Sequence, residues 1–66
     1  MQYFKDIAKK ENVYRIVNDW THEYVETLNA SDAIDKYGEC LYYGGYTEGF
    51  TENGGFEVTV WLDCWS

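Results

Sequence analysis

Residues 56–65, Phe-Glu-Val-Thr-Val-Trp-Leu-Asp-Cys-Trp, alternate between two kinds of side chain along their whole length. One set of alternate positions is apolar and consists of Phe56, Val58, Val60, Leu62 and Cys64. The other set consists of Glu57, Thr59, Trp61, Asp63 and Trp65. Because successive side chains on a strand point to opposite faces, this period of two predicts a strand whose apolar set lies in the core. The second set is expected at the solvent, or beneath an N-terminal helix.

The segments before this strand predict further strands. Asn53-Gly54-Gly55 is a strong hairpin turn, which would join the last strand to its predecessor. A strand is expected over 39–43 and a second strand, or a continuation of the first, over 46–50, with a turn or bulge at Gly44–Gly45 between them. Residues 13–20 and 22–28 are rich in β-branched and aromatic side chains and predict another hairpin, with its turn around residues 18–21.

Two helices are expected. Residues 29–38 carry the clearer signal, because Asn29 or Ser31 can cap the first turn and Gly38 suits a left-handed C-terminal position. Residues 2–11 have helical apolar spacing and predict an N-terminal helix that ends near Asn12. The fold class is therefore α+β, a single domain over 1–66, with an antiparallel sheet of three to five strands, one short packed helix and an N-terminal helix, in the order α-β-β-α-β-β. A β-α-β-β arrangement with residues 3–8 extended and a small curled barrel are the alternatives.

The charge of the chain is strongly negative and unevenly distributed. The formal net charge at pH 7 is −7. Residues 1–15 hold four of the five basic residues, whereas residues 16–66 hold only Lys36 against ten carboxylates. Such a body projects a negative field, which repels nucleic acid and anionic membranes and attracts basic protein surfaces. Because nucleic-acid-binding proteins carry the commonest basic surfaces, the sequence predicts one of them as the partner.

Seven residues are the predicted contacts with this partner. Glu57 and Asp63 lie on the outward side of the last predicted strand, where residues two apart are about 6.6–6.8 Å apart, close to the phosphate spacing of nucleic acid. Trp61, between them, is the expected anchor. The full set of partner-binding residues is Glu48, Glu52, Glu57, Trp61 and Asp63, with Asp32 and Asp35 on the central helix as secondary contacts.

Other classes of function are not favoured by the sequence. The chain has a single histidine, His22, and no serine placed for a triad, so we expect no enzymatic activity, no cofactor and no metal site. No apolar run approaches the roughly 18 residues of a membrane span, and no secretory signal follows Met1. We therefore expect a cytoplasmic protein whose Cys40 and Cys64 stay reduced, with a disulfide as the alternative if the chain is secreted.

In size, acidity and aromatic content (20% Phe, Trp and Tyr), the chain resembles the small virus-encoded inhibitors of bacterial defence and repair proteins. These include anti-CRISPR proteins, anti-restriction DNA mimics and inhibitors of uracil-DNA glycosylase. The resemblance implies a phage-encoded inhibitor in the host cytoplasm that occupies a basic nucleic-acid-binding surface and blocks engagement of DNA or RNA. A CRISPR effector subunit would be a natural target. No signature residues match, so no functional position is carried over.

Alternative functions remain open at this stage. An acidic antitoxin or immunity protein would use the same electrostatics against a basic toxin. A module that forms a homodimer through its aromatic strand would need no basic ligand, and a carbohydrate-binding module would stack Trp and Tyr on sugars. Direct binding of nucleic acid is not expected, because no basic groove accompanies the aromatic cluster of Tyr42, Tyr43 and Tyr46.

Overall fold

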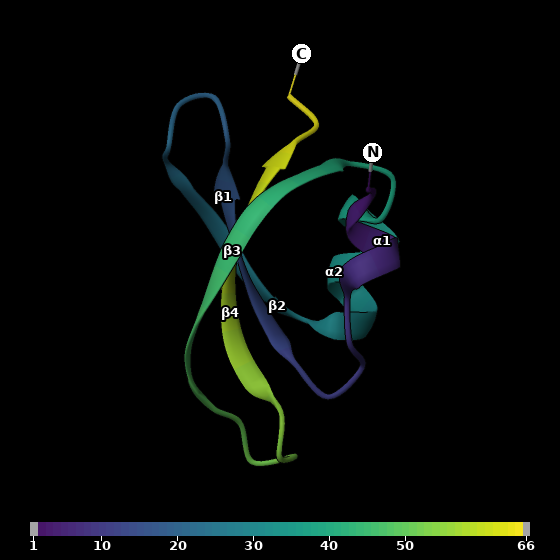
Figure 1. Ribbon diagram of the computed structural model, residues 1–66, viewed down its shortest axis with the longest axis vertical. Helices are drawn as coiled ribbons and strands as arrows, with labels where there is room; N and C mark the ends of the chain where they lie inside the picture. Colours follow the sequence, from purple (N-terminus) through teal and green to yellow (C-terminus); the bar gives the residue numbers. More distant parts are fainter. Residues whose placement is uncertain (1, 66) are drawn as a thin grey trace.

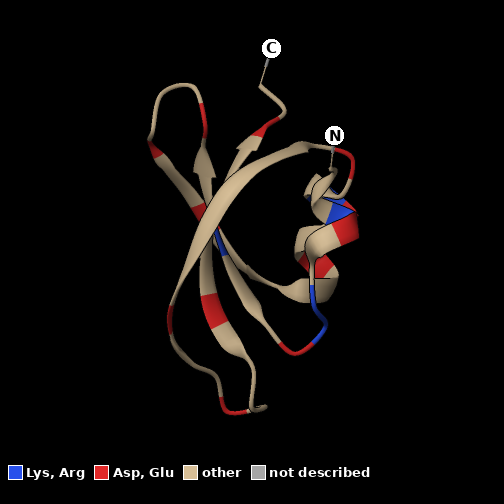
Figure 2. Ribbon diagram, viewed as in Figure 1, with Lys and Arg blue, Asp and Glu red and all other residues tan. Residues whose placement is uncertain are grey.

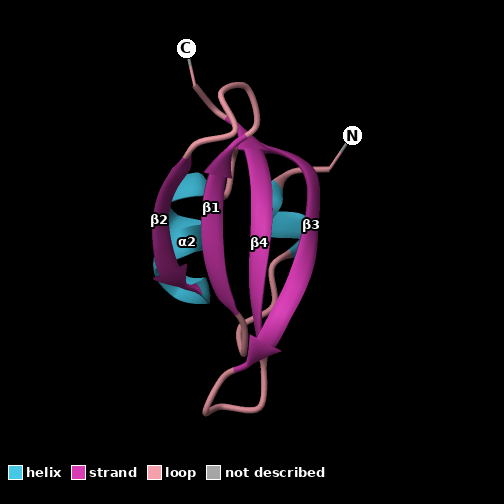
Figure 3. Cartoon of the chain, turned by 90° about the vertical axis from the view of Figure 1, so that its left-hand side faces the viewer, coloured by secondary structure: helices cyan, strands magenta, loops and turns pink. Residues whose placement is uncertain are grey.

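The computed structural model describes residues 2–65, and its elements follow the predicted succession along the chain (Figure 1). They are α1 (Phe4–Ile7), β1 (Val13–Asn18), β2 (Tyr24–Asn29), α2 (Ala30–Tyr37), β3 (Leu41–Phe50) and β4 (Phe56–Asp63). The strands form one sheet in the order β2-β1-β4-β3. Both helices lie on one face of the sheet and leave the other face uncovered (Figure 3). A small α+β fold is therefore confirmed.

The prediction of a purely antiparallel sheet is wrong, because the sheet is mixed. β1 and β4 pair in parallel, with register from Val13 opposite Glu57 to Asn18 opposite Leu62. The outer pairs, β1 with β2 and β3 with β4, are antiparallel. The segment containing α2 carries the chain from the β2 edge to the β3 edge, so β4 returns between β3 and β1 and runs in the direction of β1. Hydrophobic alternation identifies the buried side of a strand but not the direction of its neighbour.

The helices differ from the prediction at their ends. α1 ends at Ile7 and not near Asn12: Ala8 is already extended, and the backbone amide of Lys9 donates to the hydroxyl of Tyr14 at 2.7 Å. That hydrogen bond holds the segment after α1 against β1. α2 is capped by Asn29 as predicted, since its side chain accepts from the amide of Asp32 at 2.9 Å. Gly38 is right-handed (φ −55°, ψ −33°), so its predicted left-handed conformation is wrong.

The strands also differ in detail. Residues 46–50 continue the strand predicted over 39–43, which is one of the two predicted alternatives, and the single strand β3 has irregularities between Tyr42 and Gly44 and between Thr47 and Gly49. The bulge lies at Tyr43, one residue before the predicted position, since Gly44 and Gly45 pair in register with Trp61 and Val60. β1 ends at Asn18, whose side-chain oxygen accepts from the amides of Trp20 at 2.8 Å and Thr21 at 3.1 Å. This local hydrogen bonding turns the chain and shortens both strands of the first hairpin.

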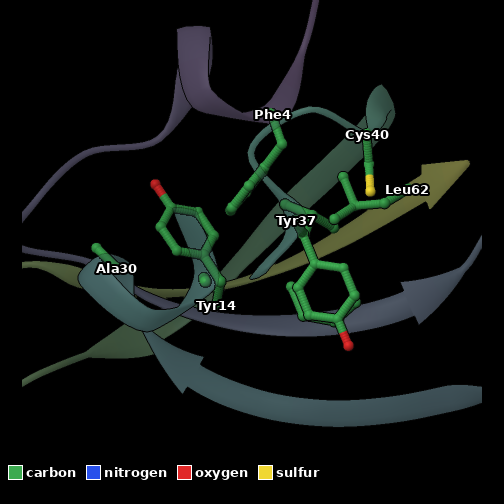
Figure 4. Close-up of a cluster of buried hydrophobic side chains, with 9 residues drawn as sticks. Phe4, Tyr14, Ala30, Tyr37, Cys40 and Leu62 are labelled. Carbon is green, nitrogen blue, oxygen red and sulfur yellow. The ribbon is translucent and has the colours of Figure 1, made fainter. Parts of the chain in front are cut away.

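The core lies between the helices and the sheet face that they cover. Phe4 and Tyr14 meet edge to face, with ring centroids 4.9 Å apart and planes at 88°. Figure 4 shows these rings with other members of the cluster, which is completed by Ile16, Ala30, Ala33, Tyr37, Cys40, Val60 and Leu62. Of the apolar set predicted for β4, Val60 and Leu62 are buried and Val58 packs against them, whereas Phe56 and Cys64 are exposed. Phe56 lies beyond the reach of the helices and packs against Phe50 instead, at 4.9 Å between centroids.

The turn between β3 and β4 is hydrogen-bonded to the segment before β1. The amide of Phe56 donates to the side-chain oxygen of Asn12 at 2.9 Å, and the hydroxyl of Thr51 donates to the carbonyl of Glu11 at 3.3 Å. Gly55 is buried at this contact, and a Cβ there would overlap the carbonyl group of Glu11. Gly54 has φ +81°, as the predicted hairpin turn requires.

Gly55→Ala therefore tests this contact. A methyl group would push the turn away from residues 11–12, so we expect the free energy of unfolding to fall by about 1–3 kcal/mol. Gly49→Ala is the matched control, because a Cβ at that position would have no neighbouring atom within 4 Å, and we expect a change of at most about 0.5 kcal/mol. Urea titration followed by circular dichroism measures both, and equal midpoints for the two variants would contradict the assignment.

Candidate protein-binding surface

The sheet face without helices, here called the open face, is covered by its own long side chains. It carries the residues that alternate with the core positions of β1 and β4 and those opposite them in register: Arg15, Val17, Thr27, Tyr46, Glu57, Thr59 and Trp61. Val17 is 9% exposed and Thr59 is 2% exposed although no helix covers them. Trp61 packs on Tyr46, with centroids 5.4 Å apart, so larger neighbours shield the smaller residues.

Arg15 is the cation at the centre of the open face. Its guanidinium donates hydrogen bonds to the carboxylates of Glu48 and Glu57, and Glu48 also accepts from the hydroxyl of Thr59 at 3.3 Å. Burial by itself would lower the pKa of Arg15, but the hydrogen bond to Glu57 and the two carboxylate charges raise it above its ordinary value. Glu48 and Glu57, two of the predicted partner contacts, are thus already paired within the chain.

Two further ion pairs hold other parts of the fold. Lys5 pairs with Glu39 at 2.7 Å, and Lys36 pairs with Glu26 at 2.6 Å. Within residues 2–65, three cations therefore pair with four carboxylates. The remaining carboxylates have no ion pair in that part of the chain; they are Asp6, Glu11, Asp19, Glu23, Asp32, Asp35, Glu52 and Asp63.

Three of these carboxylates gather where β1 and β4 end. The amide of Asp19 donates to the carbonyl of Leu62 at 3.1 Å, which holds Asp19 beside the strand end that carries Asp63. The carbonyl of Glu23 accepts from the amide of Asn18 at 3.0 Å, across the same turn. Figure 2 shows these acidic segments at one end of the sheet, whereas the basic segment between α1 and β1 lies toward the other end. We call the three carboxylates, together with Trp20, the acidic end.

Trp20 is the most exposed tryptophan among the described residues, at 80%. It lies in the turn between β1 and β2, flanked by Asp19 and followed two residues later by His22, which has φ +62°. Trp61 lies two residues before Asp63 on β4, on the open face. The acidic end therefore combines carboxylates that lack a cation with one fully presented indole and a second indole close by.

The seven predicted contacts do not share one surface. Glu48, Glu57 and Trp61 lie on the open face, and Asp63 lies at the end of β4. Glu52 is exposed in the turn between β3 and β4, at the opposite end of the molecule (Figure 2). Asp32 and Asp35 are on α2, on the helix-covered side, and Asp35 lines a depression with Lys10.

Trp65, two residues beyond the end of β4, does not lie where the alternating pattern predicts it. The alternating pattern predicts it beside Trp61, but its ring packs on Tyr37 at 6.0 Å between centroids, against the core on the helix side. Its indole nitrogen donates to the carbonyl of Leu62 at 2.7 Å. The alternation ends with the strand at Asp63, and the chain then folds the last ring back over the core.

Sequence reasoning missed Asp19, Glu23 and Trp20 as one group with Asp63. Forty-four positions separate Asp19 from Asp63, and only the parallel pairing of β1 with β4 brings them together. A usable signal was present, however. Asp19 and Trp20 lie in a predicted turn, where an indole has no neighbouring strand to cover it.

Comparison with protein-family models, curated proteins and solved structures gives no match to this chain. Within residues 2–65, no three His, Cys, Asp or Glu side chains are grouped so that they could hold a metal ion. Neither described helix has the length and hydropathy that crossing a membrane requires.

Arg15→Gln tests the ion pairs of the open face. Glu48 and Glu57 would face each other without a cation, so we expect a lower Tm at low ionic strength. Lys5→Gln, in a more exposed pair whose side chains are 44% and 80% accessible, is the matched control and should lower Tm less. The triple variant R15Q/E48Q/E57Q should recover part of the loss, and equal Tm values for R15Q and K5Q would contradict the assignment.

Glu26→Gln tests the hydrogen bonds that join β2 to α2. Hydrogen bonds from Lys36 and then from Tyr37 lower the pKa of Glu26 below its ordinary 4.5. Because the folded pKa is the lower one, this stabilisation is present above pH 4.5 and is lost as the pH falls through the folded pKa. We expect E26Q to have a lower Tm than the wild type at about pH 7 and the difference to shrink at about pH 3. Glu23→Gln is the control, and a difference between E26Q and wild type that is independent of pH would contradict the prediction.

Proposed function

We propose that this protein is a small acidic inhibitor that binds the basic nucleic-acid-binding surface of a target protein and blocks its engagement of DNA or RNA. The observation that carries the proposal is the acidic end, where Asp19, Glu23 and Asp63 lie at the same end of the sheet and form no ion pair within residues 2–65. A CRISPR effector subunit is one target that would have the basic nucleic-acid-binding surface this proposal requires.

No ion pair within residues 2–65 relieves the electrostatic repulsion at the acidic end. Asp19 and Asp63 follow neighbouring residues of two paired strands, so their like charges repel and make this end less stable than neutral side chains would. A row of Arg or Lys on a partner would relieve this repulsion, since charge-assisted hydrogen bonds to carboxylates are among the stronger polar contacts. Opposite charge also speeds association and disfavours anionic partners.

The exposed indole of Trp20 would supply affinity. Exposed tryptophans are over-represented among the residues that dominate binding energies, especially at the centre of a charged or polar rim. Trp20 is presented in this way between carboxylates of the acidic end. In this proposal Trp20 takes the role of anchor that the alternating pattern assigns to Trp61. Trp61 lies on the open face, next to the acidic end.

Two triple variants with equal net charge test the proposal. Asp19→Asn/Glu23→Gln/Asp63→Asn removes the acidic end, and Glu11→Gln/Asp35→Asn/Glu52→Gln removes three carboxylates elsewhere, so each changes the net charge from −7 to −4. Immobilised wild type and both variants are used to capture proteins from a bacterial lysate at low and high salt. Each captured protein is then purified and titrated with labelled double-stranded DNA or RNA in the presence of the domain.

The expected result is a captured nucleic-acid-binding protein that the wild type displaces from its DNA or RNA. The acidic-end variant should bind it at least about tenfold more weakly, and the second variant should bind nearly as tightly as wild type, because local carboxylates matter more than net charge. Binding should also weaken with salt. Equal loss in both variants, or a captured protein that retains its nucleic acid while bound, would contradict the proposal, and a salt-independent homodimer as the only complex would favour the alternative module.

A further inference from the structure

The two cysteines lie opposite each other at one end of the sheet, where β3 begins and β4 ends. The antiparallel register pairs Leu41 with Asp63, and Cys40 and Cys64 are the next residues outward on the two chains. Directly opposed residues of an antiparallel pair have Cα atoms about 4.5–5.5 Å apart, which is within the span that a disulfide bridges. The topology therefore brings together two thiols that are far apart in the sequence.

The two thiols differ in exposure, and the thiol of Cys40 lies on the side of the sheet that faces the helices. Cys40 is 8% exposed and belongs to the core cluster, and Figure 4 shows its sulfur directed toward Leu62. Cys64 is the first residue after β4 and is exposed. Burial, and next a hydrogen bond with Cys40, raise the pKa of Cys64 to about 12. This influence of Cys40 on Cys64 agrees with the strand register, which sets the two residues opposite each other.

We propose that Cys40 and Cys64 form a reversible intramolecular disulfide by exchange with a low-molecular-weight disulfide such as oxidised glutathione. The thiolate of the exposed Cys64 attacks one glutathione sulfur, which forms a mixed disulfide and releases one glutathione thiolate. The thiolate of Cys40 then attacks the Cys64 sulfur and releases the second. Each glutathione thiolate takes up one of the two protons lost by the cysteines, so two protein thiols are oxidised and one glutathione disulfide is reduced to two thiols.

The bond would stabilise the fold chiefly by restricting the unfolded chain. It would close a loop that contains all of β3 and β4, and loop closure of this length removes considerable entropy from the unfolded state. The folded backbone already holds the two positions together, so the bond requires little rearrangement of the sheet. The redox poise of the surroundings, and not a geometric barrier, then decides whether the pair is oxidised.

An equilibrium measurement tests the proposal, because the raised pKa of Cys64 slows exchange without changing its end point. The wild-type protein is brought to equilibrium at about pH 8 in buffers of reduced and oxidised glutathione, once without denaturant and once in urea above the unfolding midpoint. Thiols are then counted by alkylation and mass spectrometry. Because the disulfide favours the folded state, the native protein should have an oxidation equilibrium constant about 100-fold larger than the unfolded chain.

The oxidised native protein should be a monomer that has lost both thiols, with a Tm about 10 °C above that of the reduced protein. Cys40→Ser, which keeps the exposed thiol, should form only the mixed disulfide with glutathione and show no such shift. Equal equilibrium constants in native buffer and in urea would overturn the proposal. Oxidation that gives only disulfide-linked dimers, or a Tm that does not rise on oxidation, would overturn it as well.

Discussion

The insertion of β4 between β1 and β3 is the constraint on which the rest of this structure depends. Pairing with β1 in parallel places Val58 beside Tyr14 and Val60 beside Ile16, and so creates the core that α1 and α2 cover. The same pairing brings the end of β4 to the end of β1 and thereby assembles the acidic end. Pairing with β3 sets Cys40 opposite Cys64.

The insertion also explains how a domain with a net charge of −7 tolerates carboxylates on its central strand. Glu57 on β4 and Glu48 on β3 face the open side, and register with β1 places Arg15 between them. A single guanidinium can serve two carboxylates because it presents several donors in a fixed plane. The paired cations therefore lie where elements pack together, whereas the ends of β1 and β4 keep carboxylates without partners in the described chain.

Much of the fold could be predicted from local patterns. The period of two, the Asn-Gly-Gly turn and the cap at Asn29 each describe a local conformation, and they agree with the structure, the period of two within the strand that ends at Asp63. The direction of β4 relative to β1 could not be predicted, because side-chain alternation is the same for either direction. Trp65 and Gly38 were misplaced for a related reason, since their positions depend on packing against Tyr37 and Lys5 from other elements.

The candidate site was less predictable than the fold because charge composition does not tell which carboxylates are paired. Glu57 and Asp63 occupy equivalent positions in the alternating pattern, yet Glu57 binds Arg15 and Asp63 has no ion pair within residues 2–65. The difference arises from the charged residue that lies near each one on β1: Arg15, which is opposite Thr59, reaches Glu57 two residues away, whereas Asp63 has Asp19 beside it. Only the three-dimensional pairing separates structural carboxylates from those available to a partner.

The last residues of β4 connect the acidic end with the cysteine pair. Asp63 contributes to the acidic end, and the next residue, Cys64, faces Cys40 across the strand pair. A strand end with few covering contacts loses conformational freedom when it binds, which weakens association. A disulfide at Cys64 would remove part of that freedom in advance and hold Asp63 beside Asp19. Because the free protein would then already have the order that the complex needs, the bond would favour binding without any new contact with the partner.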